Sequence, residues 1–401
     1  MGRLEITLPK EHQHPLEIFL IFLRLGLTSF GGPIAHLGYF RQEFVERYKW
    51  LDEHAYADLV SLCQFLPGPA SSQVGIAIGL SRGGVSGAIA SWLGFTLPSA
   101  ILLVIFGLSS VENHLGSDWL HGLKIAAVAV VAQALWVMGK SLSPDKIRAT
   151  IAICAAAMAT LIPSSLGQLA AIAAGGFFGW AFLNVSTVLP HNSIQTKTGR
   201  NTGMALLMMF FILLVLLPVA ASSTNSHIIK LFDSFYRVGS LVFGGGHVVL
   251  PLLQSQVVPS GWISNDAFLA GYGAAQAIPG PLFTFAAYLG AVSTQTPSSW
   301  AGAGIALTAI FLPSFLLIIG ILPFWEQLRR YKTMQRAMLG INAAVVGILL
   351  AAFYNPVWIS SIRSPVDFCL ASTAFLLLVF WKSPPWLVVL LAALVTGLGI
   401  G

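Results

Sequence analysis

The sequence is poor in charged residues. Only 9% of its 401 residues are Asp, Glu, Lys or Arg, whereas 56% are hydrophobic, and the mean hydropathy is +0.79. A soluble globular domain carries roughly 25% charged residues, so this composition excludes a soluble protein and predicts one that crosses a membrane several times. The net charge of +6 lies mainly in loops, where it reports orientation in the bilayer rather than a nucleic-acid partner.

Cysteines are scarce too, and the motifs of catalytic and metal sites are absent. Cys63, Cys154 and Cys369 lie far apart in apolar stretches without metal-ligand spacing, so we expect buried, inert thiols. The sequence has no P-loop and no Gly-x-Ser-x-Gly elbow, and the Gly-Gly-Gly-His run at 244–247 is too short a signal for a metal site. We therefore expect no enzyme, no metal and no cofactor.

The sequence does contain an internal duplication. Three short motifs of the first half return in the second half, in the same order and at nearly the same spacing. The pairs are FLRLGLTSFGG (22–32) with FYRVGSLVFGG (235–245), QFLPGP (64–69) with QAIPGP (276–281), and LPSA (97–100) with LPSF (312–315). Three matches in register are not a chance event, so the chain consists of two homologous copies.

The loop charges predict that the two copies have opposite orientations in the membrane. The apolar segment 84–110 follows the basic stretch 41–49 and is followed by VENHLGSD, which has no Lys or Arg. Its counterpart, 298–323, follows an uncharged stretch and precedes EQLRRYKTMQR. Because basic loops stay in the cytoplasm, the first segment runs outward and the second runs inward. We predict an all-α polytopic membrane protein with two inverted-topology repeats.

This pattern divides the chain into three parts. We expect a first repeat at 1–187, a linker loop with a connector membrane span at 188–227, and a second, inverted repeat at 228–401. A crossing takes about 20 residues, so some of the expected spans are short. Besides the two segments above, the expected spans are 119–139, 149–163, 166–187, 203–221, 337–355, 366–381 and 386–400.

Each repeat opens with two apolar segments that contain helix breakers, Phe-Gly-Gly in the first segment and Pro-Gly-Pro in the second. Non-helical backbone inside a bilayer is tolerated only where it faces protein, water or a substrate. The segments are either full crossings or re-entrant hairpins. Hairpins are favoured in the first copy, because full crossings would place the basic loop 41–49 outside.

The breaks also predict a binding site for an anion. Discontinuous helices in inverted repeats build midplane substrate sites, and the helix N-terminus after a break offers N–H donors and partial positive charge. An arginine in apolar sequence precedes each Gly-Gly, and such a charge costs roughly 2.5–3.5 kcal/mol at the bilayer centre, which argues for an anionic ligand. Snorkelling or a local ion pair is the alternative. Asp233 offers Arg237 such a pair, whereas Arg24 has no acid within a helical turn.

The predicted oxyanion-binding residues follow from these motifs. The first break is followed by Ala-Ser-Ser-Gln and the second by Leu-Phe-Thr-Phe, so the first copy contributes more side-chain donors. The two glutamines before the breaks either contact the substrate or satisfy the broken backbone. The set is Arg24, Gly31, Gly32, Gln64, Pro67, Gly68, Pro69, Ser71 and Ser72 in the first copy, and Arg237, Gly244, Gly245, Gln276, Pro279, Gly280 and Pro281 in the second.

Other polar residues are expected in structural or solvated positions. Asp58 is expected at a solvated helix start, and the alternative is that it carries a coupling proton. The remaining expectations are N-caps at Asp52 and Ser264, a solvated or interfacial face with His36, Glu43 and Glu46, and a snorkelling Lys124.

The motifs SFGGPIAHLGYF, FLPGPASSQ, VFGGGHVVLPLL and AIPGPLFTFAAYLG together resemble the chromate ion transporter family, in its long-chain form with two fused homologous domains. The resemblance covers nearly the whole chain. It implies a secondary transporter in the bacterial cytoplasmic membrane that exports chromate and confers chromate resistance. Sulfate, a dianion of the same shape, is the competing substrate. A carrier of another oxyanion, an anion channel and a membrane enzyme are the alternatives.

Export agrees with the electrical driving force. The cell interior is negative, and moving one charge through 100 mV is worth about 2.3 kcal/mol, so a departing dianion gains on the order of 4–5 kcal/mol. The sequence leaves open whether protons are coupled to this movement and whether the chain forms a homodimer.

Overall fold

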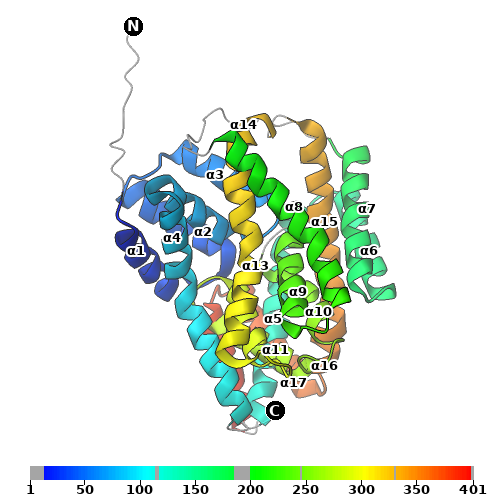
Figure 1. Cartoon of the computed structure of the whole chain (residues 1–401). Coiled ribbons are helices and arrows are strands. Elements are labelled where there is room, and N and C mark those ends of the chain that lie inside the picture. Colours follow the sequence, from blue (N-terminus) through cyan, green and yellow to red (C-terminus); the bar gives the residue numbers. More distant parts are fainter. Residues whose placement is uncertain (1–12, 113–116, 185–198, 244–245, 329–330, 399–401) are drawn as a thin grey trace.

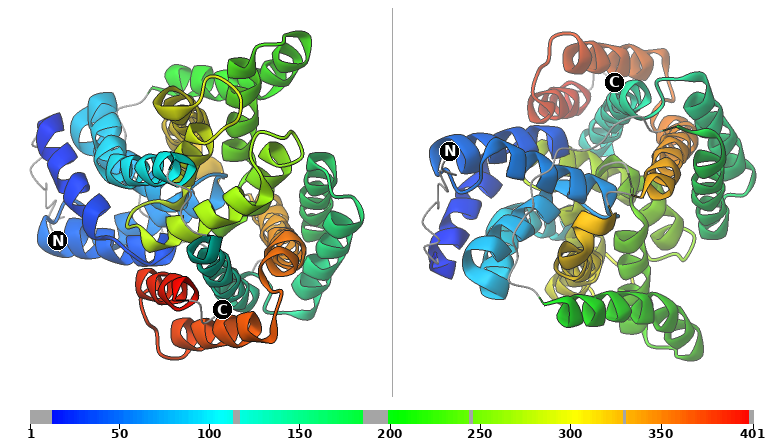
Figure 2. Two further views of the ribbon diagram at one scale, coloured as in Figure 1. Left: turned by 90° about the horizontal axis from the view of Figure 1, so that it is seen from below. Right: turned by 90° about the horizontal axis from the view of Figure 1, so that it is seen from above.

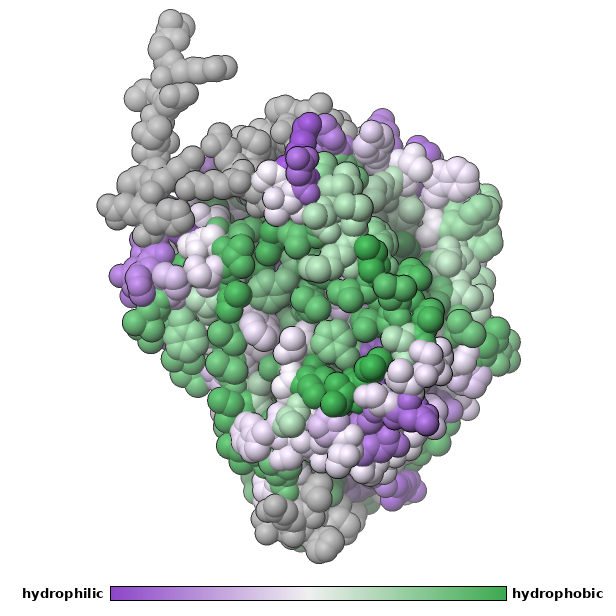
Figure 3. Space-filling view, in the orientation of Figure 1, coloured by the Kyte–Doolittle hydropathy of each residue, from purple (hydrophilic) through white to green (hydrophobic). Residues whose placement is uncertain are grey.

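The structure, a computed structural model, describes residues 13–112, 117–184, 199–243, 246–328 and 331–398 (Figure 1). These residues form helices joined by short loops, with no strand among them. Within these ranges, five helices are long and apolar enough to cross a membrane: Ala70–Ser109, Trp119–Leu142, Arg200–Ser223, Ser299–Phe324 and Lys332–Ser361. Hydrophobic residues cover the middle of the face in Figure 3, and hydrophilic ones lie toward its upper and lower ends. The prediction of an all-α membrane protein is confirmed.

The helices of the two halves follow one another in the same order. The first half contains α1 (Pro15–Thr28), α2 (Gly32–Arg41), the π-helical η1 (Gln42–Arg47), α3 (Glu53–Phe65), α4 (Ala70–Glu112), α5 (Ser117–Leu142), α6 (Lys146–Leu161) and α7 (Ser165–Phe182). The helix α8 (Arg200–Ser223) follows; it includes residues 203–221 and is long and apolar enough to cross a membrane.

The second half begins with α9 (His227–Leu241), η2 (Gly246–Val248), α10 (Val249–Val257), α11 (Asn265–Ala277), η3 (Leu282–Thr284), α12 (Phe285–Ala291) and α13 (Ser299–Ile321). It ends with η4 (Leu322–Phe324), α14 (Trp325–Leu328), α15 (Lys332–Ala352), η5 (Phe353–Trp358), α16 (Ile359–Ser361), α17 (Pro365–Val379) and α18 (Pro385–Gly397). By the sequence matches, α1 and α3 correspond to α9 and α11, and by the order of the elements α5 and α6–α7 correspond to α15 and α17–α18.

The long helix α4 corresponds to two helices of the second half. A straight helix of its 43 residues would be about 65 Å long, about twice the thickness of a bilayer's hydrocarbon core. Gly83 and Gly84 have non-helical backbone angles and divide α4 into a first part, which corresponds to α12, and a second part, which corresponds to α13. In Figure 1 the second part of α4 runs from top to bottom, whereas α13 runs from bottom to top.

Each half packs its terminal helix hairpin against the other half. The hairpin α6–α7 contacts α15, and the hairpin α17–α18 contacts α5 (Figure 2). Small residues allow these helices to approach closely, as is usual between membrane helices. A Cβ atom at Gly179 of α7 would touch the backbone of Gly340 in α15, and one at Gly122 of α5 would touch Ala392 in α18.

The helices on either side of the motifs are short. The helices α1, α2 and α3 have 14, 10 and 13 residues, and α17 and α18 have 15 and 13. At 1.5 Å per residue, each is about 15–23 Å long, less than the roughly 30 Å of a bilayer's hydrocarbon core. The expected spans at 366–381 and 386–400 are therefore shorter than a perpendicular crossing requires.

The two expected N-caps are confirmed. The side chain of Asp52 accepts a hydrogen bond from the Ala55 N–H at the start of α3 (2.8 Å), and that of Ser264 accepts one from the Ala267 N–H at the start of α11 (3.2 Å). These equivalent caps fix where the second apolar segment of each half becomes helical.

Two expectations about side-chain burial were wrong. Cys63 is buried, but Cys154 and Cys369 are exposed on the outer faces of α6 and α17. Lys124 does not snorkel: it is buried, and its Nζ lies 2.9 Å from Asp266 Oδ1 of α11. This partner lies 142 residues away in the sequence, so local sequence patterns could not predict the ion pair.

Candidate functional site

Each Pro-Gly-Pro break is held by the backbone of the other half. The N–H of Gly68 donates to the carbonyl of Val242 (2.7 Å), and the N–H of Gly280 donates to the carbonyl of Ser29 (2.9 Å). Ser29 and Val242 are equivalent residues, each immediately before a Phe-Gly-Gly motif. We call this meeting point of the two breaks with Ser29 and Val242 the crossing.

A second reciprocal contact explains why both breaks contain glycine. Gly68 and Gly280 have φ angles of 120° and 106°, which side chains rarely allow. A Cβ on Gly68 would lie 2.8 Å from Ser314 Oγ, and one on Gly280 would lie 2.8 Å from Ser99 Oγ. Ser99 and Ser314 are the equivalent serines of the LPSA and LPSF motifs. Sequence analysis matched these motifs but assigned them no place in the site.

The first turn of α4 brings buried polar side chains to the crossing. Ser71, Ser72 and Gln73 are all buried, and Gln73 Nε2 donates to the carbonyl of Pro67 (2.6 Å), which braces the break. His36 of α2 lies between Ser71 and Ser29: its Nδ1 is 3.4 Å from Ser71 Oγ, and its Nε2 is 3.2 Å from the Ser29 carbonyl.

The expected solvated position of His36 was therefore wrong. This side chain is 1% exposed, because α2 packs it against the ring of Phe95 in α4. Sequence analysis counted Gln73 among the side-chain donors that follow the first break but did not include it in the predicted set of oxyanion-binding residues.

The second break is followed by fewer polar groups. The hydroxyl of Thr284 donates to the carbonyl of Pro281 (2.7 Å), and the neighbouring Phe283 and Phe285 are buried in the core. The helix α12 has only seven residues. The asymmetry between the breaks, anticipated from their sequences, is present in the structure.

The first Phe-Gly-Gly motif separates α1 from α2. Gly31 and Gly32 have φ angles of 100° and 77°, so the chain turns there in a conformation that favours glycine. His247 of η2 lies near Gly32, and its Nδ1 is 3.0 Å from the Tyr272 hydroxyl. The predicted site residues Gly244 and Gly245 lie outside the described residues.

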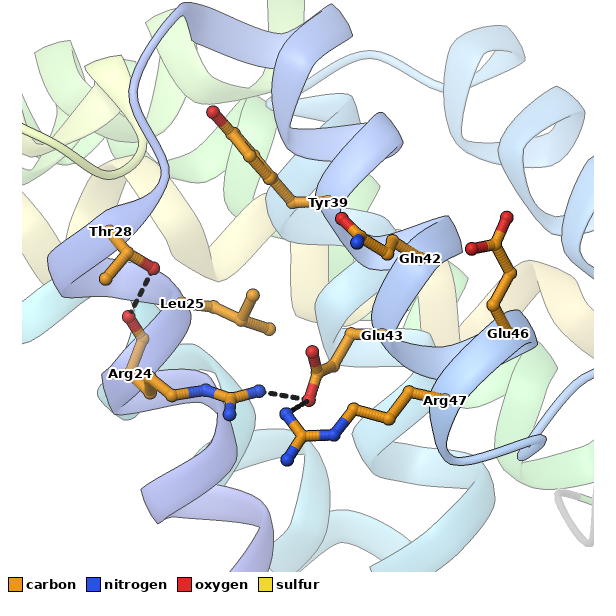
Figure 4. A pocket seen from close by; sticks show the side chains of 8 residues that line it. All are labelled: Arg24, Leu25, Thr28, Tyr39, Gln42, Glu43, Glu46 and Arg47. Carbon is orange, nitrogen blue, oxygen red and sulfur yellow. Dashed lines mark hydrogen bonds and ion pairs between the residues drawn. The ribbon is translucent and has the colours of Figure 1, made fainter.

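Arg24 lies in a pocket of about 460 Å³ at the surface (Figure 4). Its guanidinium pairs with Glu43 of η1, and Arg47 Nη1 lies 3.0 Å from the same carboxylate oxygen. The Arg24 side chain is 46% exposed, and Leu20 and Leu27 on neighbouring turns of α1 are also exposed. The residues that line the pocket are Arg24, Leu25, Thr28, Tyr39, Gln42, Glu43, Glu46 and Arg47.

The solvated position expected for Glu43 was wrong, since only 11% of its side chain is exposed. Glu46, in contrast, is exposed as expected, and it pairs with Arg41. Two guanidinium groups share the carboxylate of Glu43, and the carboxylate of Glu46 also lines the pocket, so the charges of the lining balance. Guanidinium groups bind oxyanions through paired N–H donors, and the half-exposed guanidinium of Arg24 can offer such donors.

Arg237 forms the ion pair with Asp233 that the sequence offered as the alternative to a substrate contact. Arg24 and Arg237 each stand five residues before the carbonyl at the crossing, Ser29 or Val242. On a helix this is a distance of about 7–8 Å along the axis. The two arginines therefore lie in equivalent positions, more than one helical turn from the crossing.

The glutamines before the breaks and the prolines of the breaks were also predicted to bind the oxyanion. Gln64 is exposed, whereas Gln276 is half-buried and its Nε2 has no protein partner. Pro67, Pro69, Pro279 and Pro281 are part of the crossing itself. The expected solvated helix start at Asp58 was wrong, because Asp58 is buried and accepts a hydrogen bond from Trp325 Nε1 (3.2 Å).

Among the described residues, no group of three or more His, Cys, Asp or Glu side chains is placed to hold a metal ion. At the crossing, the N–H groups of Gly68 and Gly280 and the amide N–H of Gln73 already donate to carbonyl groups. The donors that remain for an anion are hydroxyl groups without a protein partner.

A family model described as "Chromate transporter" matches residues 16–180 and 229–398. The chain is 26% identical to the "Chromate transport protein" of Pseudomonas aeruginosa over 403 residues, which cover 96% of this chain and 92% of the relative. It is also 26% identical to the "Chromate transport protein" of Cupriavidus metallidurans, over 94% of this chain and 92% of the relative. The "Uncharacterized transporter YwrA" of Bacillus subtilis is 26% identical over 132 residues, which cover 33% of this chain and 74% of that protein. No solved structure matches the chain.

Proposed function

The chain belongs to the chromate transporter family, and from this premise we propose that it exports chromate across the bacterial cytoplasmic membrane as a secondary transporter. The names of its full-length relatives support chromate as the substrate. Export follows the membrane potential, which favours the departure of a dianion by about 4–5 kcal/mol at 100 mV. Chromate resistance of the cell would be the consequence.

The two halves act, in this proposal, as inverted repeats that bind the oxyanion at the crossing. The opposite directions of α13 and the second part of α4 favour this arrangement. The observation that carries the proposal is the reciprocal pair of hydrogen bonds, from Gly68 to Val242 and from Gly280 to Ser29. A site held by both repeats at once can change its accessible side when one repeat tilts against the other.

The short helices around the breaks favour re-entrant segments over full crossings. The helices α1, α2 and α3 are each shorter than the hydrocarbon core, and their non-helical ends lie against protein at the crossing. The N-terminus of α4 points its partial positive charge toward the same place. The prolines and glycines of both breaks shape this site, and Ser71 and Ser72 contribute hydroxyl groups.

Arg24 and Arg237 hold a second role in the proposal. Both lie more than one helical turn from the crossing and already carry a carboxylate partner, so they attract the oxyanion on its path rather than hold it at the midplane. The Arg24 side chain is the more exposed of the two, 46% against 27%, which makes the first repeat the stronger attractor.

Flux measurements with the purified chain in lipid vesicles test this function. Chromate uptake should follow an imposed voltage and should be accelerated by unlabelled chromate on the opposite side, because a carrier exchanges substrate. Flux without this acceleration would indicate an anion channel. A preference for sulfate over chromate in competition would make the chain a sulfate carrier. Voltage and pH gradients imposed separately would show whether protons are coupled.

A further inference from the structure

The amide nitrogen of Gln276, a half-buried residue before the second break, has no protein partner. Five further polar atoms without a protein partner lie at the crossing and are more deeply buried, and four of these five belong to the first repeat. A buried hydroxyl group without a protein partner usually binds water or a ligand. Each of these residues is at most 3% exposed. The atoms are Ser29 Oγ, Ser72 Oγ, Thr96 Oγ1 and Ser314 Oγ, together with the amide oxygen of Gln73, which is an acceptor and adds no donor.

The contacts of these groups place them around the same two breaks. Ser314 Oγ and the Gln73 amide both lie within 3 Å of the point where a Cβ of Gly68 would stand. Ser72 precedes Gln73 in the same helical turn. On the other side, the Ser29 carbonyl accepts the N–H of Gly280, and His36 links Ser29 to the first turn of α4.

Thr96 completes this set from the second part of α4. It lies one helical turn before Ser99, whose hydroxyl is 2.8 Å from the Cβ position of Gly280. Ser99 itself donates to the Thr96 carbonyl (3.1 Å), so its own donor is used.

The equivalent positions of the second repeat offer no such hydroxyl groups. Val242 replaces Ser29, and Phe311 replaces Thr96. Thr284 replaces Ser72, but its hydroxyl already donates to the Pro281 carbonyl. Ser314 is therefore the one hydroxyl group without a protein partner that the second repeat contributes to the described part of the crossing.

We propose that the chain binds one tetrahedral oxyanion, held at the N-terminus of α4 by the hydroxyls of Ser29, Ser72 and Thr96 from the first repeat and of Ser314 from the second. This inference rests on the proposed function and assigns the site to the first break. The ligand set carries no full positive charge, which allows the anion to leave again. Ser314 lies on α13, so a movement of the second repeat removes one donor and weakens binding.

The test compares equivalent residues of the two repeats. Ser72→Ala and Ser314→Ala should each weaken sulfate and chromate binding about tenfold or more, because each loses a hydrogen bond to a charged ligand. Their thermal stability should be unchanged, since neither hydroxyl has a protein partner. The matched control, Thr284→Val, should show the reverse pattern: it loses the bond to Pro281 and unfolds at a lower temperature, with unchanged affinity. Titration calorimetry of the purified chain also gives the number of sites, which should be one.

Several results would overturn the inference. Wild-type affinity in both alanine variants would show that these hydroxyls bind water only. Two sites per chain would show that both breaks bind an oxyanion, and so would an equal loss of affinity in Thr284→Val. If one alanine variant does not fold, the other decides, and wild-type affinity in that variant would contradict the proposal. If the wild type neither binds nor transports chromate or sulfate, the proposed function itself fails.

Discussion

Replacement of Gly68 by alanine should disrupt the crossing, because the added methyl group collides with two side chains. The new Cβ would lie 2.6 Å from Gln73 Nε2 and 2.8 Å from Ser314 Oγ, closer than real Cβ atoms approach such neighbours. The Gln73 amide cannot simply move away, because it braces the break through the carbonyl of Pro67. Ser314 lies on α13 of the other repeat, so its hydroxyl must turn away from the break.

Two contributions give the size of the effect. A non-glycine residue at a φ of 120° costs about 1–3 kcal/mol in backbone strain. The loss of the Gln73 hydrogen bond adds about 0.5–1.5 kcal/mol. Gly68→Ala should therefore destabilise the crossing by about 2–4 kcal/mol, which is enough to reduce the population of the closed arrangement by more than tenfold.

The matched control is Gly84→Ala. Gly84 also has a positive φ angle of 62°, but a Cβ there would have no neighbour within 4 Å. The Gly84→Ala variant therefore has backbone strain from a positive φ angle, but its new Cβ collides with no other atom. Chromate flux into vesicles and thermal unfolding of the purified protein should be measured for both variants. Gly68→Ala should lose most of its flux while Gly84→Ala keeps most of it, and equal flux in the two variants would refute a role for the contact between the repeats.

Three further predictions concern the surface and the topology. Arg24→Ala should raise the chromate concentration needed for half-maximal flux several-fold without reducing membrane insertion, and unchanged flux kinetics would contradict its proposed role in attracting the anion. The backbone N–H and guanidinium of Arg148 hold the pKa of Asp145 below its ordinary value of 3.8. Asp145→Asn should therefore lower the unfolding temperature above pH 4, and the difference from the wild type should vanish as the pH falls through the lowered pKa. Single cysteines at Ser81 and Gln295, in a chain without its native cysteines, should react with an impermeant maleimide from opposite sides of the membrane; labelling from the same side would contradict the inverted repeats.

Local patterns predicted the helices and their ends well. Helix-breaking residues, N-caps and apolar runs act within a few residues, so the positions of α3, α11 and the connector α8 could be derived from the sequence. The ion pair of Asp233 with Arg237 was also within reach, because residues four apart on a helix are neighbours.

Contacts between distant segments were not within reach of the sequence. Arg24 has no acid on its own helix, and its partner Glu43 comes from η1, beyond the turn at Gly31 and Gly32. His36 was expected in a solvated position because its burial depends on how α2 packs against α4. The duplication did contain one long-range signal, the matched serines Ser99 and Ser314, whose meaning became clear only when each was found against the glycine of the other repeat.

The asymmetry of the crossing is compatible with both breaks being retained, although most of the hydroxyl donors belong to the first repeat. The second break does not need to bind the anion in order to matter. Its Gly280 N–H occupies the carbonyl of Ser29, and this bond fixes the backbone that carries the Ser29 hydroxyl. The first break receives the same support from Val242, whose side chain has no donor to offer. The two halves of the chain thus support each other's breaks. Most of the hydroxyl donors lie in the first half, and in the proposed site a single dianion there also contacts a donor from the second half.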